Sequence, residues 1–413
     1  MRKAAIVIVL AAGLTAGIGA QQSASDVTQW RGANRDGVVT GFKAPSAWPE
    51  QLTQIWKIEV GLGYATPIVV GNRVYMFSRQ NDDEVMSAID AASGKVLWRT
   101  AYSAPFEMNS AAAPHNKGPK STPVFSNGKL FAIGMTGVIT AYDANTGKQL
   151  WQKPGSEPLP LYTTHSFSPI IEGGLVIFHV GGHGGGALTA FDINTGAAKW
   201  SWSGDGPGYG SPIVITLDGT RQVITKTQQK LVGVDVSNGT LLWEVPYVTQ
   251  STTNSLTPLV YGQTVILGGN GRPVEAYAPR RRNNQWVAEK VWENGDVTMR
   301  MTNGVIVGDM LVSLSTRNSG QYFTLDAKTG KLLWTSEGRQ AVNASVLKVG
   351  DTLLSLENDG ELVVLRPAGP AMEPLRRYRV ADSETFSTWT QPTLSGNRIF
   401  IKDLTSLAVW VAD

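Results

Sequence analysis

The side chains best suited to metal or acid–base chemistry are the four histidines of the chain. His179 and His183 stand four residues apart in FHVGGHGGG, while His115 and His165 lie upstream. The apolar residues around His179 predict a strand, on which positions four apart share a face but lie about 13 Å from each other. That separation is too long for two ligands of one ion. The spacing favours ordinary surface or rim histidines, and we assign no metal site.

Other catalytic motifs do not occur in the sequence. The chain has no cysteine, which removes thiol nucleophiles, disulfides and thiolate metal sites. It has no G-x-S-x-G nucleophile elbow. The glycine-rich run at 181–186 lacks the Lys-Ser/Thr ending and the following helix of a phosphate loop, and it predicts a hairpin instead. No catalytic residue is assigned.

A second set of side chains recurs three or four residues before the start of each predicted innermost strand. The series at three residues before is Tyr64, Lys120, Ser166, Tyr209, Ser255, Met301, Asn343 and Trp389. The two series together supply aromatic rings, two cations, a histidine and asparagines but no carboxylate, which suits a planar, anionic or hydroxyl-rich ligand. We predict ligand binding by Tyr64, Lys120, His165, Tyr209, Asn254, Arg300, Asn343 and Trp389.

A recurring sequence phrase, Asp-x-x-(Thr/Ser/Asn)-Gly followed by Trp, predicts the strands that position these residues. The aspartate can accept backbone N–H groups two or three residues on, and the glycine takes the positive φ of a tight turn. Each copy therefore predicts a strand, a turn and a second strand whose tryptophan packs between neighbouring sheets. Five copies occur: AIDAASGKVLW (88–98), AYDANTGKQLW (141–151), AFDINTGAAKW (190–200), GVDVSNGTLLW (233–243) and TLDAKTGKLLW (324–334).

A second phrase, Ser/Thr-Pro followed by apolar residues and a glycine turn, precedes most copies of the first. Proline opens a strand without losing a ladder hydrogen bond, and a Gly-containing dipeptide between apolar runs predicts a hairpin. The two phrases together predict four strands in each repeat. We call the Asp-x-x-(Thr/Ser/Asn)-Gly turn of the first phrase the Asp turn. In the fifth and seventh repeats, residues 278–284 and 366–370 take its place.

The two ends of the chain share one repeat. Residues 391–413 match three strands and stop before the fourth, while QIWKIEV (54–60) resembles an outer strand without the three before it. Pairing these segments closes a ring and removes exposed sheet edges. We therefore predict an all-β, eight-bladed β-propeller, with outer-strand aromatic positions 42 to 53 residues apart at Trp56, Trp98, Trp151, Trp200, Trp243, Trp292, Trp334 and Tyr378.

Composition and the N-terminus indicate the compartment. Residues 1–20 have a basic start, an apolar stretch too short for a bilayer and small residues before Ala20, as in a secretory signal peptide. We expect a lead-in at 21–47, the propeller at 48–413, no membrane span, and a periplasmic or secreted monomer. A net charge of +3 with 17% charged residues gives no electrostatic reason to bind nucleic acid.

The A-x-D-x-x-T-G-K-x-x-W phrase resembles the repeat of the pyrroloquinoline quinone (PQQ)-like propeller family, over about residues 48–413. That family includes quinoprotein alcohol dehydrogenases and the propeller lipoprotein of the outer-membrane assembly machinery. For a dehydrogenase the resemblance implies PQQ, calcium beside it, a carboxylate base and a pair of adjacent cysteines. The chain has no cysteine, and the predicted site has no carboxylate.

Two classes of function follow. The first is a binding module without a cofactor, which holds a protein partner or a small-molecule ligand at the channel mouth, as the resemblance to the assembly lipoprotein implies. The second is a PQQ-dependent alcohol or sugar dehydrogenase with PQQ and calcium in a non-standard site. Fold alone does not choose between them.

Overall fold

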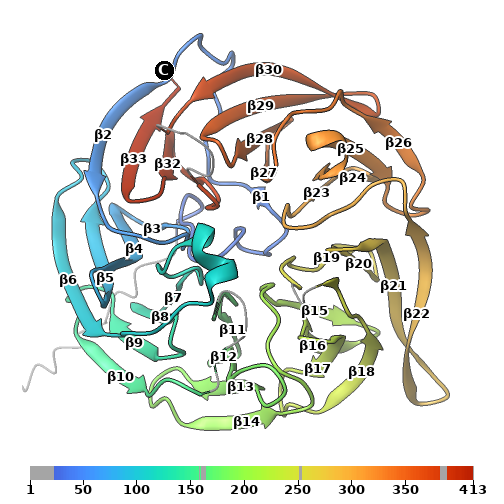
Figure 1. Cartoon of the computed structure of the whole chain (residues 1–413), viewed down its shortest axis with the longest axis horizontal. Coiled ribbons are helices and arrows are strands. Elements are labelled where there is room, and N and C mark those ends of the chain that lie inside the picture. Colours follow the sequence, from blue (N-terminus) through green and yellow to red (C-terminus); the bar gives the residue numbers. More distant parts are fainter. Residues whose placement is uncertain (1–22, 158, 160–163, 251–253, 382–387, 413) are drawn as a thin grey trace, which may run out of the picture.

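Eight β-sheets surround one central axis (Figure 1). The computed structural model describes residues 23–157, 159, 164–250, 254–381 and 388–412, so the signal peptide predicted at 1–20 lies outside the described residues. The first strand of each sheet is innermost and the fourth outermost (Figure 1). The predicted all-β, eight-bladed propeller is confirmed.

The chain builds the first four blades in sequence order, with strand order 1-2-3-4 in each antiparallel sheet. Blades one to four consist of β3 (Ile68–Val70), β4 (Arg73–Gln80), β5 (Asp83–Asp90) and β6 (Val96–Ser103); β7 (Val124–Ser126), β8 (Lys129–Ile133), β9 (Ile139–Asp143) and β10 (Gln149–Lys153); β11 (Ile170–Glu172), β12 (Leu175–Val180), β13 (Ala187–Asp192) and β14 (Ala198–Trp202); β15 (Ile213–Leu217), β16 (Thr220–Lys226), β17 (Lys230–Asp235) and β18 (Leu241–Pro246).

Blades five to seven keep this order, and blade seven gains a fifth strand, β1 (Val38–Val39), at its inner edge. Blade eight takes its outermost strand, β2 (Thr53–Glu59), from the N-terminal part of the chain. Blades five to eight consist of β19 (Leu259–Tyr261), β20 (Thr264–Gly269), β21 (Arg272–Arg282) and β22 (Gln285–Asn294); β23 (Val305–Val307), β24 (Met310–Ser315), β25 (Gln321–Asp326) and β26 (Leu332–Thr335); β27 (Ala344–Val349), β28 (Thr352–Glu357), β29 (Glu361–Ala368) and β30 (Ala371–Arg379); β31 (Thr393–Ser395), β32 (Arg398–Lys402), β33 (Ser406–Val411) and β2 (Thr53–Glu59).

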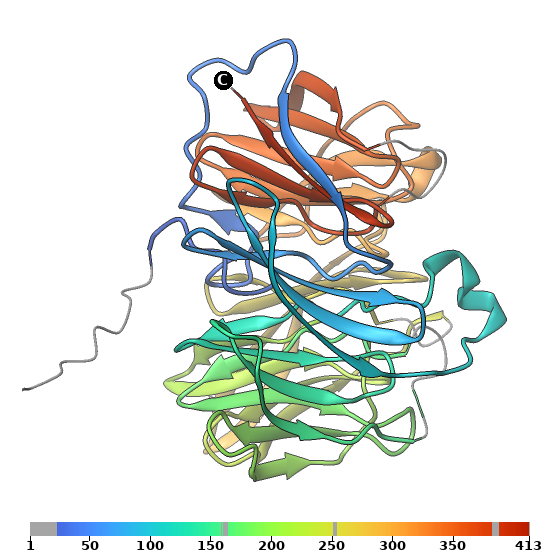
Figure 2. The same cartoon turned by 90° about the vertical axis from the view of Figure 1, so that its left-hand side faces the viewer.

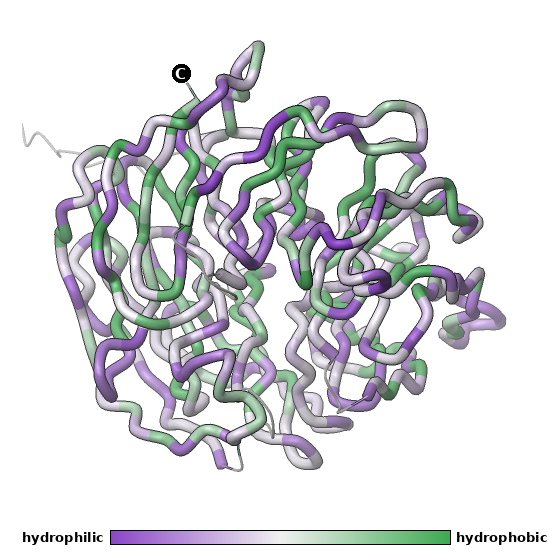
Figure 3. The backbone as a smooth tube through the Cα atoms, turned by 45° about the horizontal axis from the view of Figure 1, so that its top comes forward, coloured by the Kyte–Doolittle hydropathy of each residue, from purple (hydrophilic) through white to green (hydrophobic). Residues whose placement is uncertain are grey.

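Many strand segments are hydrophobic (Figure 3), and their buried side chains form clusters shared by neighbouring blades. One buried cluster joins Met76 of blade one to Tyr142 of blade two and Phe400 of blade eight, so adjacent sheets share a core. Helical structure in the described part of the chain includes two short 3₁₀ helices, η1 (Ser110–His115) and η3 (Arg317–Ser319). Among the described residues, no helix has the length and apolar character needed to cross a bilayer.

The Asp turn of one blade receives the tryptophan of the blade before it. In blade one, Asp90 Oδ1 accepts the backbone N–H and the hydroxyl of Ser93, both at 2.8 Å, and Gly94 has φ +74°. The Trp56 ring covers that turn, and its Nε1 donates to Ala91 O at 3.2 Å. A Cβ on Gly94 would lie 3.0 Å from the Trp56 ring. The contact repeats at Trp98, Trp151, Trp200 and Trp292, so the predicted packing of tryptophan between blades is confirmed.

The degenerate turn of blade five changes this contact. There β21 and β22 continue into a long hairpin, whose tip is formed by Asn283 and Asn284 at positive φ. Because this hairpin has no Asp turn, the preceding Trp243 donates instead to Gln222 Oε1 of its own blade at 2.7 Å. The tryptophan stays buried although its partner has been lost.

The ring closes as the two chain ends predict. Strand β2 pairs antiparallel with β33, with Lys57 opposite Ala408, and becomes the outer strand of blade eight. Figure 1 shows β2 beside β33. The N-terminal segment therefore completes the sheet that the C-terminus begins.

The lead-in fills the central channel. Its strand β1 pairs parallel with β27, and Val27 bridges to Val69 of blade one. Arg31 and Arg35 are buried on the axis, where Arg31 donates to Gly304 O and Arg35 donates to Ser168 O and Pro212 O. We call residues 23–47 the channel plug, since they cross-link the starts of several blades from within.

Candidate functional site

A cavity of about 160 Å³ lies at the mouth of the channel, above the plug. It is lined by all eight members of the series three residues before the innermost strands. This series converges because each member ends a connection that enters its blade at the axis. The lining consists of Tyr64, Lys120, Ser166, Tyr209, Ser255, Met301, Asn343 and Trp389 from that series, with Trp30, His115, Ser168, Ser211, Thr257 and Asn303.

A ring of hydrogen bonds below this series explains the Ser/Thr-Pro phrase. In several blades, the residue before the opening proline donates its backbone N–H to the side chain of the equivalent residue in the next blade. Thr66 N donates to Thr122 Oγ1 at 3.1 Å, Thr122 N to Ser168 Oγ at 3.0 Å, and Ser168 N to Ser211 Oγ at 3.1 Å. Thr257 N donates in the same way to Asn303 Oδ1 at 2.8 Å. We call these residues the hydroxyl belt.

The hydroxyl belt supplies hydrogen-bond donors to the cavity. Ser168 and Ser211 each accept a backbone N–H, and Thr257 accepts the indole N–H of Trp30 at 2.9 Å. Each of these oxygens accepts one hydrogen bond within the protein, and its hydroxyl proton is available to a ligand together with a second lone pair. No carboxylate lines the cavity in the described part of the chain. The cavity is therefore rich in donors and suits a ligand with acceptor atoms.

The floor and the cover of the cavity come from residues outside the predicted set. Trp30 of the channel plug forms the floor. His115, at the end of η1, lies edge-on to the Trp389 ring with centroids 5.0 Å apart, so η1 crosses the mouth from blade one towards blade eight. A lone tryptophan in the non-repeating lead-in signalled the floor, whereas nothing local in SAAAPHNKG indicated that η1 turns inward.

Lys120 behaves differently from a permanent cation. Its Nζ donates to Asn116 O at 3.0 Å and Gly118 O at 3.2 Å, and lies 3.9 Å from Met135 Sδ. Burial lowers the pKa of this ammonium from 10.5 to about 7, and the nearby carboxylate of Glu84 offsets only part of that effect. Lys120 therefore loses its proton near neutral pH, far below an exposed lysine, whereas the sequence predicts a cation at this position.

Three predicted residues do not line this cavity. His165 is buried, with Nδ1 3.5 Å from Met135 O, and burial lowers its pKa to about 4. Asn254 is buried and donates Nδ2 to the backbone oxygens of Thr227, Gln228 and Tyr247. Arg300 lies in a neighbouring hollow together with His115 and Trp389. Tyr64, Lys120, Tyr209, Asn343 and Trp389 are brought together, and ligand binding by the set stays a prediction.

The histidines are less exposed than the sequence indicated. His179 is fully buried on β12, its Nε2 is 3.1 Å from Asp205 O, and burial lowers its pKa to about 4. His165 is 2% exposed. Both are neutral core groups, which corrects the expectation of surface or rim histidines. Across residues 23–412, apart from the gaps noted above, no three His, Cys, Asp or Glu side chains gather in a way that could hold a metal ion.

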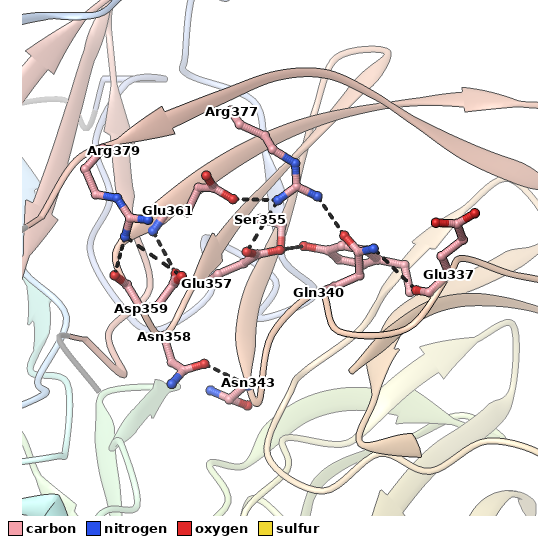
Figure 4. A network of polar contacts seen from close by, with 11 residues as sticks. Glu337, Gln340, Asn343, Ser355, Glu357, Asn358, Asp359, Glu361, Arg377 and Arg379 are labelled. Atoms are coloured by element: carbon pink, nitrogen blue, oxygen red, sulfur yellow. Dashed lines mark hydrogen bonds and ion pairs between the residues drawn. The ribbon is translucent and has the colours of Figure 1, made fainter. Parts of the chain in front are cut away.

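A polar network stands behind Asn343 at the junction of blades six and seven (Figure 4). The Asn343 N–H donates to Asn358 Oδ1 at 3.0 Å. Nearby, Glu357 accepts the Tyr322 hydroxyl at 2.8 Å and lies 3.6 Å from Arg377. Burial raises the pKa of Glu357 from 4.5 to about 7. The network thus fixes the backbone of one cavity residue.

Comparison with known proteins places this fold among relatives. The chain matches the family model described as outer membrane protein assembly factor BamB over residues 35–115, 81–312 and 289–403. It is 25% identical to the assembly factor BamB of Burkholderia pseudomallei, over 76% of this chain and 88% of that protein. It is also 25% identical to BamB of Yersinia pestis, over 60% of this chain and 63% of that protein.

A solved quinohemoprotein alcohol dehydrogenase from Comamonas testosteroni shares the architecture. Its structure superposes with a TM-score of 0.65 and 14% identity, over 94% of this chain and 80% of that chain. At this level of identity the match shows the fold alone.

Proposed function

Because this chain belongs to the family of PQQ-like repeat propellers described as outer membrane protein assembly factor BamB, we propose that it is an exported binding module. In this proposal the cavity at the channel mouth, which we call the funnel cavity, holds a small ligand or a segment of a protein partner. The BamB relatives named above are assembly factors, which supports a role in holding other molecules rather than converting them.

The observation that carries the proposal is the lining of the cavity. Tyr64, Trp389 and Trp30 contribute aromatic rings to the lining of a cavity of about 160 Å³. Hydroxyl groups of the hydroxyl belt also line it. A volume of this size accommodates about one aromatic ring, since an engineered cavity of about 150 Å³ binds benzene. The cavity therefore suits a single-ring group with acceptor atoms, whether free or at the tip of a partner segment.

A PQQ-dependent alcohol or sugar dehydrogenase is the second candidate. The architecture of the chain is compatible with this candidate, because the quinohemoprotein alcohol dehydrogenase has the same fold over 94% of the chain. Calcium does not fit the cavity, however, because this ion requires several oxygen ligands that usually include carboxylates. No lining residue among those described is acidic, and Glu84, which lies behind Lys120, is held by Met135 N and the Tyr102 hydroxyl. A tricyclic quinone is also larger than the single ring that a cavity of about 160 Å³ accommodates, so part of it would extend out of the mouth.

Thermal unfolding with and without ligand tests the binding module. Benzoate and terephthalate, single rings with carboxylates, are expected to raise the midpoint of the wild-type protein by mass action. The rise should vanish in Trp389→Ala, which removes an aromatic wall, and persist in Leu404→Ala, which truncates an exposed apolar residue that does not line the cavity.

Two results would count against the proposal. One is an equal midpoint shift in Trp389→Ala and Leu404→Ala, because the ligand would then bind elsewhere. The other is a midpoint shift with PQQ and calcium, accompanied by reduction of an electron-accepting dye in the presence of an alcohol. That second result would establish the dehydrogenase.

A further inference from the structure

We propose that Lys120 captures a carbonyl compound in the funnel cavity covalently, as an imine between its side-chain nitrogen and the aldehyde or ketone carbon of a single-ring ligand that carries a carboxylate. This inference rests on the proposed function, because it names the ligand class of the same cavity.

The amine of Lys120 is desolvated and poorly compensated. Two backbone oxygens and one thioether sulfur surround Nζ, and sulfur is a weak acceptor. A protonated lysine has three N–H donors, and here two of them find backbone oxygens while the third finds only the weakly accepting sulfur. Desolvation of this kind lowers the pKa of Lys120 to about 7 and activates a lysine as a nucleophile towards carbonyl groups.

Access to the cavity distinguishes Lys120 from two similar lysines. Burial also lowers the pKa of Lys226 and of Lys402 to about 7. Lys226 donates to Gly268 O at 2.6 Å, and Lys402 donates to Asp403 O at 2.7 Å. Both are 0% exposed and lie outside the cavity lining, whereas Lys120 is partly exposed within it. A neutral amine is thus common to three sites, but only Lys120 is placed to meet a ligand in the cavity.

The groups around Lys120 suit the rest of such a ligand. Tyr64 and Trp389 supply aromatic surface beside it. Hydroxyl donors of Ser168, Ser211 and Thr257 suit a carboxylate, and the described lining contains no acidic residue that would repel one. Burial and the charges of Lys120 and Arg300 lower the pKa of His115, so its imidazole is neutral at pH 7 and can accept or donate a proton at the mouth.

The step balances without any other reactant. Nζ of the neutral amine attacks the carbonyl carbon, and a C–N bond forms while the carbonyl π bond breaks. The two amine protons leave with the carbonyl oxygen as water, and a C=N bond remains. No atom is oxidised or reduced overall, and hydrolysis reverses the capture.

Reductive trapping tests the proposal. The protein is mixed with 4-carboxybenzaldehyde at low molar excess, reduced with cyanoborohydride and analysed by intact mass and peptide mapping. We expect one adduct per chain, on Lys120, with Lys226 and Lys402 unmodified. Labelling should rise with pH around a midpoint of about 7 rather than near the ordinary lysine value. Benzaldehyde, which lacks the carboxylate, should label Lys120 less.

Matched variants complete the test. Lys120→Arg keeps a cation but cannot form the imine, so the adduct should be lost. Lys117→Arg changes an exposed lysine three residues away, whose Nζ contacts Phe106 O, and should leave the adduct intact. Adducts spread over surface lysines, or undiminished labelling of Lys120→Arg, would overturn the proposal.

Binding of terephthalate separates this proposal from the proposed function. Terephthalate has the same ring and a carboxylate but no aldehyde, so it binds without condensing. If terephthalate raises the thermal midpoint and no Lys120 adduct forms, the cavity still binds ligands and covalent capture is wrong. If neither occurs, both proposals fail together.

Discussion

At the scale of single residues, neighbouring positions face opposite ways. Counting three residues back from each strand start found the residues that line the cavity, because these positions face the axis. Counting four back selected His165 and Asn254, which turn into the wall and bind backbone groups. Register along an extended segment alternates sides, so a shift of one residue separates a lining residue from a structural one. The sequence shows the period, but it does not show which phase points inward.

Glu357 makes stability depend on pH. Burial raises the pKa of its carboxyl from 4.5 in a model peptide to about 7. The folded protein thus holds the proton more tightly than the unfolded chain, and this contribution is complete below about pH 4.5 and lost as pH rises through about 7. We expect the contribution of Glu357, up to about 3 kcal/mol of unfolding free energy, to disappear over that interval, while the buried neutral His165 and His179 change the stability in the opposite direction. Urea denaturation of the wild type and of a Glu357 variant across the interval measures this contribution as a difference.

Two substitutions assign that loss to Glu357. Glu357→Gln keeps an acceptor for the Tyr322 hydroxyl but cannot titrate, so the loss of stability that Glu357 causes should be absent from this variant. Glu361→Gln removes another carboxylate that pairs with Arg377 and should leave the dependence largely in place. An unchanged slope in Glu357→Gln would show that another group is responsible.

At the scale of the element, the tryptophan and the Asp turn form one unit shared by two blades. The sequence predicted both parts, because each phrase fixes its own turn and its own large ring. It did not predict their partnership, since the ring of one repeat packs on the turn of the next repeat, 35 to 46 residues later. The behaviour of Trp243, which turns to Gln222 where the Asp turn is missing, follows only once that partnership is known.

Two glycines allow the contact between the tryptophan ring and the turn to be tested separately from backbone strain. Gly147 and Gly128 both lie in blade two and have nearly equal φ values of +74° and +73°, so alanine suffers the same backbone strain at each. A Cβ on Gly147 would lie 2.5 Å from the Trp98 ring, whereas one on Gly128 meets nothing within 4 Å. Gly147→Ala should therefore cost about 1–3 kcal/mol more than Gly128→Ala, from overpacking. Denaturant unfolding measures the difference, and equal costs would argue against a tight turn–ring contact.

Removing a ring has a larger effect. Trp151→Ala should lower the unfolding free energy by about 3–5 kcal/mol, as large-to-small changes in a core do. Trp389→Ala, at the cavity mouth, should leave the midpoint nearly unchanged while ligand binding is lost. Similar destabilisation by both changes would mean that Trp389 is a core residue rather than part of the site.

At the scale of the whole molecule, both chain ends hold the ring together. The missing fourth strand of the last repeat was readable from the sequence, because three strands at 391–413 require a partner and 54–60 has none. The sequence did not predict the channel plug. Arg31 and Arg35 gain their role from backbone oxygens that distant blades bring to the axis, such as Gly304 O and Pro212 O. No local pattern encodes that convergence.

Two truncations distinguish the role of β2 in closing the ring from the role of the channel plug. Deleting residues 21–60 removes β2 as well as the plug, so the edges of the first and last blades become unpaired and we expect aggregation. Deleting residues 21–47 removes the plug but keeps β2, and we expect a soluble monomer of reduced stability. Size-exclusion chromatography with light scattering distinguishes the two. A monomeric, native-like 21–60 deletion would refute closure by β2.

The path of the lead-in also determines which face of the propeller points away from a group attached before Ser23. The start of the described chain and η1 lie at opposite faces of the disc (Figure 2). A sensor chip, dye or fusion partner attached just before Ser23 would therefore leave the funnel directed outward into solution. Immobilisation through that end should preserve capture of analytes, whereas coupling near η1 should obstruct it by steric crowding.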